Sequence, residues 1–275
     1  MSHAHRGAAR TVGAARLVPR RIIESSDRPA GSFRAYSLGR GFLPTVLLRD
    51  LGIFCVDTVS PVTALTYDDG PDPRSTPKVL DVLERHGATA TFFVLSGAAQ
   101  KHPDLVRRIV TDGHEIALHG TDHRSLLTRT TADATRMVRA SRMIVEDLAG
   151  ARVRLYRPPY GEHTAAQGRA IHRLGLRTII WSGHAEDWVD APPSDVAGRA
   201  VMSVFPGSIV LLHDTRADPE TLQPGERMPD FDRGDVLDRV LQSIHADGYS
   251  TATVSDMISR YPIVHSMARE RMRQG

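Results

Sequence analysis

The chain has 275 residues, a length that suits one large α/β domain and leaves little room for a second. Its net charge of +3 comes from scattered arginines instead of one basic block, which argues against a nucleic-acid partner. Cys55 is the single cysteine, so no internal disulfide is possible and the fold depends on its apolar core.

The N-terminal residues carry basic charges without the apolar segment that follows them in a signal peptide. No stretch approaches the roughly 18 uncharged apolar residues of a membrane span. We therefore expect a cytoplasmic protein with no membrane insertion. Residues 1–45 show no clean periodicity, and we interpret them as an N-terminal extension, flexible or partly strand, ahead of a catalytic domain over 46–275.

From about residue 62 the chain alternates short apolar segments with segments of helical length, which is typical of βα units around a parallel sheet. Capping residues, prolines and terminal glycines predict helices over 76–87, 103–113, 164–175, 194–205 and 235–248. The predicted strands are rich in β-branched or aromatic residues and cover 62–67, 91–95, 115–118, 153–156, 177–181, 208–213 and 250–254. Seven such units predict a seven-stranded (β/α) barrel, whose active site lies at the C-terminal ends of the strands.

Residues with suitable chemistry fall at or just beyond these strand ends. Asp68 and Asp69 follow the first strand, and His119 and His123 follow the third. One Asp and two His leave coordination positions open, as in a catalytic metal site. Residues four apart share one face of a helical turn, so the two histidines can reach one ion. Taken singly, the motifs also fit two surface histidines on a helix and a plain Asp-Gly-Pro turn.

Two later segments add candidates. Arg157 precedes two prolines that stiffen the loop and leave the Tyr160 N–H as a fixed donor, which suits an oxyanion. His213 follows an apolar strand, where a structural core histidine is the alternative interpretation. The Pro- and acid-rich segment 215–234 is either a substrate lip on the catalytic face or a solvated loop.

The motifs TYDDGP, HGTDH, RPPYG, AEDW and LLHD stand in an order and spacing that resemble the NodB-type polysaccharide deacetylases, carbohydrate esterase family 4. The resemblance covers about residues 62–255. It implies an α/β fold, the distorted (β/α)7 barrel of the NodB homology domain. It also implies a divalent metal held by Asp69, His119 and His123, and hydrolytic removal of acetate from N-acetylated amino sugars.

The resemblance also implies which residues of this chain act as the general base and stabilise the oxyanion. The metal would lower the pKa of its bound water and polarise the amide carbonyl. Asp68 would take the water's proton, with Arg157 positioned to hold that carboxylate ionised. The Tyr160 N–H would stabilise the oxyanion together with the metal.

The resemblance also implies an acid side and an apolar wall. His213 would give a proton to the leaving amine. Trp188 and Leu211 would receive the acetyl methyl group, and Asp187 would tune Arg157 or His213 by its charge. A donor set of two His and one Asp suits zinc, and also cobalt, nickel, manganese or iron.

Two positions depart from the family pattern. Gly120 stands where a Ser or Thr usually braces the loop, and His184 replaces a familiar Asp of the fourth motif. Two alternatives follow: a hydrolase of a non-sugar amide or cyclic imide on the same fold, and a non-catalytic carbohydrate- or metal-binding module. Since the metal, base, oxyanion and acid positions are all present, we expect activity on an N-acetylated polysaccharide, oligosaccharide or small glycoconjugate.

Overall fold

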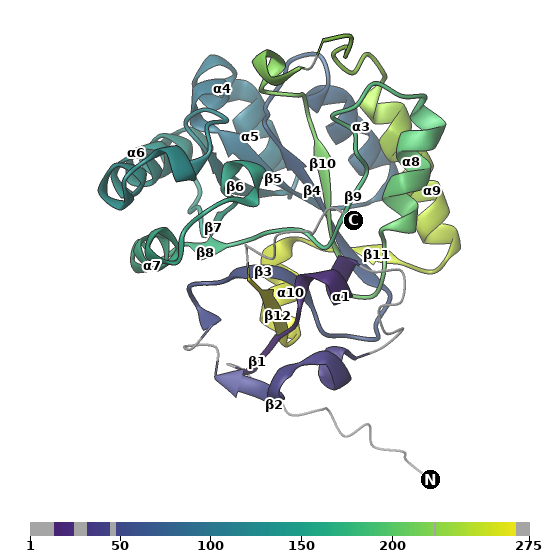
Figure 1. The fold of residues 1–275 in the computed structure, drawn as a ribbon. Coiled ribbons are helices and arrows are strands. Elements are labelled where there is room, and N and C mark those ends of the chain that lie inside the picture. The colour runs from purple at the N-terminus through teal and green to yellow at the C-terminus, as the bar shows by residue number, and fades with distance from the viewer. Residues whose placement is uncertain (1–13, 25–31, 45–47, 223, 268–275) are drawn as a thin grey trace.

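The computed structural model describes residues 14–24, 32–44, 48–222 and 224–267, and Figure 1 shows a helix-covered sheet above a smaller one. The strands are β1 (Ala14–Leu17), β2 (Leu38–Pro44), β3 (Gly52–Val56), β4 (Val62–Asp68), β5 (Ala90–Leu95), β6 (Glu115–Gly120), β7 (Leu155–Tyr156), β8 (Arg177–Thr178), β9 (Gly183–His184), β10 (Ile209–His213), β11 (Ser250–Thr251) and β12 (Ile263–Ser266).

The helices are α1 (Arg20–Glu24), α3 (Thr76–His86), α4 (Ser96–Lys101), α5 (Pro103–Thr111), α6 (Thr131–Ala149), α7 (Ala165–Arg173), α8 (Pro193–Met202), α9 (Arg233–Ala246) and α10 (Val254–Arg260). Short 3-10 turns cover η1 (Phe33–Tyr36), η2 (Leu126–Thr128), η3 (Pro159–Gly161) and η4 (Pro219–Thr221). Among the described residues, no helix combines the length and apolar character needed to cross a membrane.

The large sheet is the distorted seven-stranded barrel that the sequence predicts. Its order is β8-β7-β6-β5-β4-β10-β9, with neighbouring strands parallel, and β11 pairs with the start of β4. The order begins at β8 and ends at β9, each of two residues, and within the described residues these two edge strands do not pair, so hydrogen bonds do not close the barrel. Helices cover its outer face (Figure 1).

The alternation of side chains along β4 explains why the site lies inside the barrel. Leu65 and Tyr67 pack outward into the core shared with the helices, whereas Ala64 packs with the apolar residues of the inner cluster. Because side chains alternate along a strand, Thr66 and Asp68 share the inner face with Ala64. Asp68 therefore ends the strand on the inside, at the carboxyl end where barrel active sites form.

The smaller sheet joins the two ends of the described chain. Its order is β2-β1-β12-β3, with β1 parallel to β12 and β12 antiparallel to β3. It lies at the end of the barrel opposite the loop that follows β10 (Figure 1). Part of the predicted N-terminal extension is thus strand, residues 1–13 and 25–31 lie outside the described residues, and a boundary at residue 45 stays a prediction.

Several predicted strands are shorter in the structure, for identifiable reasons. The strand expected over 153–156 is reduced to β7, since the Val153 N–H donates to Glu146 of α6 instead of joining the sheet. The strand expected over 250–254 ends at Thr251, because the Thr253 side chain caps α10. The strand expected over 177–181 is reduced to β8, and the chain then bonds to β3 through Ile180.

Candidate active site

The carboxylate that ends β4 is buried against a guanidinium group. Arg157 is fully buried after β7 and donates from Nη1 to Asp68 Oδ1 at 2.6 Å and to Thr66 Oγ1 at 2.9 Å. Its Nη2 donates to Ile180 O at 3.1 Å, and its guanidinium lies 4.1 Å from the centre of the Phe93 ring. Burial raises the pKa of Asp68 and Arg157 lowers it, with a net rise to about 6. Such a carboxylate retains the basicity that a general base needs.

Three side chains converge beside Asp68. Potential ligand atoms of Asp69, His119 and His123 lie within 4.8 Å of one another, and both histidine Nε2 atoms are 3.5 Å from Asp69 Oδ1. Asp69 Oδ1 and His119 Nε2 are buried, and neither has a hydrogen-bond partner within the described part of the chain. Buried polar atoms are normally satisfied, so two orphaned atoms in a His2Asp donor set fit a divalent cation.

The first histidine is held in the form that a metal ligand requires. Burial is the main cause that keeps the pKa of His119 well below its usual range, and the positive charges of His123 and Arg157 add to it. The ring is therefore neutral. Its Nδ1 lies 2.8 Å from Arg157 O and donates to it, which leaves the Nε2 lone pair facing Asp69.

The two histidines meet without the helical turn that their spacing suggested, and that part of the prediction is wrong. His119 lies within β6, and His123 follows in a bend. Between them, Gly120 has φ +144°, a left-handed value that glycine tolerates and side chains disfavour. The Thr121 hydroxyl fastens the bend to Ser141 of α6 at 2.6 Å. A strand end followed by a tight bend thus brings the rings together.

Unusual backbone conformations occur within the motifs. Of the described non-glycine residues, Asp69, Tyr160 and Glu186 have positive φ, at 75°, 58° and 51°. Each such conformation costs on the order of 1–3 kcal/mol and persists only where the surroundings hold it. Asp69 is held in part by the Ala217 N–H, which donates to its Oδ2 at 3.0 Å. Strain of this kind gathers at ligand-binding and catalytic sites.

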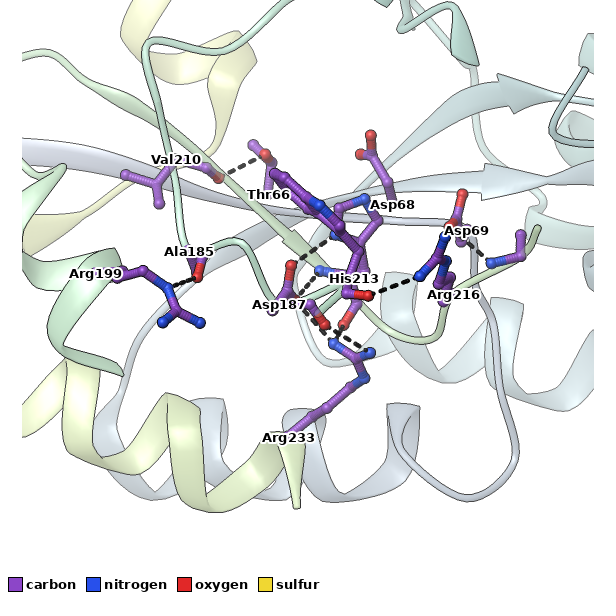
Figure 2. Close-up of polar contacts among 12 residues, drawn as sticks. Thr66, Asp68, Asp69, Ala185, Asp187, Arg199, Val210, His213, Arg216 and Arg233 are labelled. Atoms are coloured by element: carbon purple, nitrogen blue, oxygen red, sulfur yellow. Dashed lines mark hydrogen bonds and ion pairs between the residues drawn. The ribbon is translucent and has the colours of Figure 1, made fainter. Parts of the chain in front are cut away.

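A second buried ion pair stands across the cavity. Asp187 Oδ1 lies 2.8 Å from His213 Nδ1, and its Oδ2 accepts from the His213 N–H at 2.7 Å and from Arg233 Nη1 at 2.8 Å (Figure 2). Burial lowers the pKa of His213, but the Asp187 carboxylate outweighs it and raises the pKa to about 9. Asp187 therefore contacts His213, one of the two partners expected for it. Arg233, at the start of α9, was not anticipated from the sequence.

Asp68, the three potential metal ligands and His213 line one cavity of about 360 Å³, and their partners Arg157 and Asp187 lie behind them. Trp188, Leu211 and Tyr160 line it, together with Trp181. The full lining is Asp68, Asp69, His119, His123, Tyr160, Trp181, Trp188, Leu211, His213, Arg216, Asp218 and Thr221. Its size is within the usual range of small-molecule sites.

The cavity also includes residues of the 215–234 segment that sequence reasoning did not single out. Asp218 is 8 % exposed and accepts from the Tyr160 hydroxyl at 2.8 Å and from Arg216 Nε at 3.2 Å. Burial acts to raise its pKa, but His123, Tyr160 and Arg216 outweigh that and hold it well below the usual range. The only feature of the sequence that pointed to Asp218 was its place in the long acidic segment after His213. That segment was equally consistent with a substrate-binding lip and with a solvated loop.

His184, the departure in the fourth motif, contacts the cavity wall. Its ring centre lies 5.4 Å from that of Trp188, which in turn meets the His213 ring edge-on at 5.6 Å. His184 therefore supports an aromatic wall of the cavity. The carboxylate that pairs with His213 comes from Asp187.

The chain is similar to known proteins over most of its length. The polysaccharide deacetylase family model matches residues 56–179. A chitooligosaccharide deacetylase of Sinorhizobium fredii is 36% identical over 193 residues, which cover 70% of this chain and 89% of that protein. The chain belongs to the polysaccharide deacetylase family.

Other members of the polysaccharide deacetylase family show the same similarity. A peptidoglycan-N-acetylglucosamine deacetylase of Bacillus cereus is 32% identical over 194 residues, 70% of this chain and 67% of its own length. A crystal structure of a peptidoglycan N-acetylglucosamine deacetylase superposes with a TM-score of 0.68 at 28% identity, covering 78% of this chain and 96% of that one. The family resemblance and the barrel fold predicted from the motifs are both confirmed.

Proposed function

We propose that the protein is a metal-dependent deacetylase that hydrolyses the N-acetyl amide of an N-acetylated amino sugar and releases acetate. One observation carries the proposal: a single cavity brings together a His2Asp donor set, a carboxylate paired with arginine and a histidine paired with a carboxylate. Two relatives are named as deacetylases of chitooligosaccharides and of peptidoglycan N-acetylglucosamine, and these names support an N-acetylated amino sugar as the substrate.

Water attack is assigned to the β4 side of the cavity. A divalent ion held by Asp69, His119 and His123, zinc first and cobalt, nickel, manganese or iron as alternatives, would supply Lewis acidity and an acidified water. Asp68 takes the proton of the attacking water, and Arg157 at 2.6 Å orients that carboxylate. The backbone N–H of Tyr160 donates to the oxygen that gains negative charge.

Departure of the amine is assigned to the β10 side. As the carbon–nitrogen bond breaks, the nitrogen requires a proton, which His213 supplies from Nε2. Asp187 keeps the ring protonated and fixes its orientation through Nδ1. The apolar surfaces of Trp188 and Leu211 accept the acetyl methyl group. The products are acetate and the free amino sugar.

The proposal is tested by acetate release from polymeric and small N-acetylated sugars. Metal-stripped protein is assayed with and without added Zn²⁺ or Co²⁺, beside Asp68→Asn. Metal-dependent release that disappears in the variant supports a deacetylase. Ammonia release from a non-sugar amide or cyclic imide, without acetate, would favour that hydrolase instead. Metal binding with no turnover of any compound would favour a binding module.

A further inference from the structure

The loop that follows β10 braces two of the three proposed metal ligands from behind. The Ala217 N–H donates to Asp69 Oδ2 at 3.0 Å, on the far side of the carboxylate from the histidines. Asp218 Oδ2 lies at an ion-pair distance of 3.5 Å from His123 Nδ1, a buried atom that has no hydrogen-bond partner within the described residues. The loop is therefore part of the structure that holds the donor set as well as a wall of the cavity.

We propose that Asp218 is a positioning residue of the metal site, which accepts the Nδ1–H of His123 and so leaves Nε2 unprotonated and directed at the ion. This inference rests on the proposed function. A carboxylate at the outer nitrogen of a ligating histidine fixes the tautomer and ring orientation and increases the ligand's basicity. For His119 the corresponding partner is a backbone carbonyl at 2.8 Å.

The Asp218 carboxylate is itself held in place from two directions. Its Oδ2 accepts from the Tyr160 hydroxyl at 2.8 Å, and its Oδ1 accepts from Arg216 Nε at 3.2 Å. Arg216 is anchored in turn to Trp188 O at 3.1 Å and Thr221 Oγ1 at 3.0 Å. A nearly buried carboxylate with both oxygens engaged has little freedom to turn away from the histidine.

The geometry separates this role from direct ligation. His123 Nε2 faces Asp69 Oδ1 at 3.5 Å, whereas Asp218 faces the other ring nitrogen. Within the described residues the cluster that could hold an ion consists of Asp69, His119 and His123. Tyr160 also packs edge-on against the His123 ring, with centres 4.4 Å apart, so ring and carboxylate are oriented by the same neighbour.

The test compares Asp218→Asn with Asp230→Asn, the same change at an exposed site in the same segment. Zn²⁺ and Co²⁺ affinities of the metal-stripped proteins are measured by competition with a chromophoric chelator, and melting temperatures are recorded without metal. We expect Asp218→Asn to bind each ion about 10–100-fold more weakly, the usual effect of losing such a partner. Asp230→Asn should match the wild type. The metal-free melting temperature of Asp218→Asn should be lower, because the charged acceptor of Tyr160 and Arg216 is lost, and affinities are therefore compared at a temperature at which all three proteins are folded.

The outcomes separate this inference from the proposed function. If the wild type binds neither ion, the metal-dependent mechanism fails as well. If the wild type binds and Asp218→Asn binds equally well, only the positioning role is overturned. A raised KM at unchanged metal affinity would likewise overturn it, because Asp218 would then only shape the cavity.

A measurement on the wild-type protein covers the case in which Asp218→Asn does not fold. Nitrogen-15 spectra of the histidine-labelled zinc protein report the tautomer, with His123 assigned through His123→Gln. We expect a slowly exchanging proton on Nδ1 of His123. An unprotonated or rapidly exchanging Nδ1 would overturn the proposal.

Discussion

The two sides of the cavity use the same construction for opposite chemistry. On the β4 side, Asp68 pairs with Arg157 at 2.6 Å, and on the β10 side, His213 pairs with Asp187 at 2.8 Å. Burial disfavours the charged form of both titrating groups. For Asp68 burial outweighs the arginine and the pKa rises to about 6, whereas for His213 the carboxylate outweighs burial and the pKa rises to about 9. A basic carboxylate and a protonated imidazole can thus face one substrate.

The largest expected effect comes from removing either titrating group. Asp68→Asn and His213→Asn should each lower kcat on an N-acetylated sugar by about 10²–10⁴-fold. An aryl acetate ester distinguishes them, because its phenolate leaves without a proton. On this ester His213→Asn should keep most of its activity, whereas Asp68→Asn should not. Similar losses for both variants on both substrates would contradict the division into a base side and an acid side.

Removing the cation of the β4 pair should destabilise the fold. Arg157→Met leaves Asp68 buried without its partner, which typically costs about 3–5 kcal/mol of unfolding free energy. Arg85 is the matched control, since its side chain is 62% exposed and pairs with Asp238 at the surface. Urea denaturation of Arg85→Met should show a loss of at most about 1 kcal/mol. Equal losses of unfolding free energy in the two variants would mean that the buried Arg157–Asp68 pair stabilises the fold no more than a surface pair does.

Neutralising the anion of the β10 pair should change the pH dependence. His213 must be protonated to act as the acid, so kcat falls as the pH rises through its pKa. Asp187→Asn keeps an acceptor for Nδ1–H but removes the negative charge, which lowers the pKa of His213. The alkaline limb of the kcat profile should therefore move to lower pH, and kcat at pH 8 should fall by about 10–100-fold.

Arg233→Met is the opposing control for that profile. Arg233 shares the Asp187 carboxylate with His213, so its removal leaves more of the negative charge to the histidine. The alkaline limb should then move to higher pH. A shift of both variants in the same direction would show that Asp187 does not act on His213 through its charge.

The sequence identified the motif residues because parallel strands bring their carboxyl ends to one face, so five short motifs far apart in the chain point to one cavity. Their contacts are observed, and their chemical roles and the cytoplasmic location stay predictions. Arg233 and Asp218 were missed because a charged residue at a helix start or in a long loop resembles any solvated surface residue. Only the folded backbone brings them to Asp187 and His123.

Local structure was harder to predict than the site. The four-residue spacing of His119 and His123 fits a helical turn, and it fits a strand end followed by a bend equally well. Helix α6 was not predicted, although Thr130 caps its start and Gly150 ends it in a left-handed conformation. Its buried residues recur at helical spacing, but three of the five are Ala or Ser (Ala134, Ser141 and Ala149), so the apolar stripe is not evident from the sequence.

The smallest predicted effect concerns the bend at Gly120, where the family usually has a Ser or Thr brace. The Thr121 hydroxyl bonds Ser141 at 2.6 Å, so the brace in this chain comes from the next residue. Thr121→Val keeps the side-chain shape and should cost about 0.5–1.5 kcal/mol in thermal unfolding. If the loosened bend also displaces His123, metal affinity should fall by up to about tenfold.

Adding Gly120→Ser should not compensate for Thr121→Val, because φ +144° disfavours a side chain at position 120. A double variant that recovers stability and metal affinity would contradict this assignment and show that position 120 can still carry the brace.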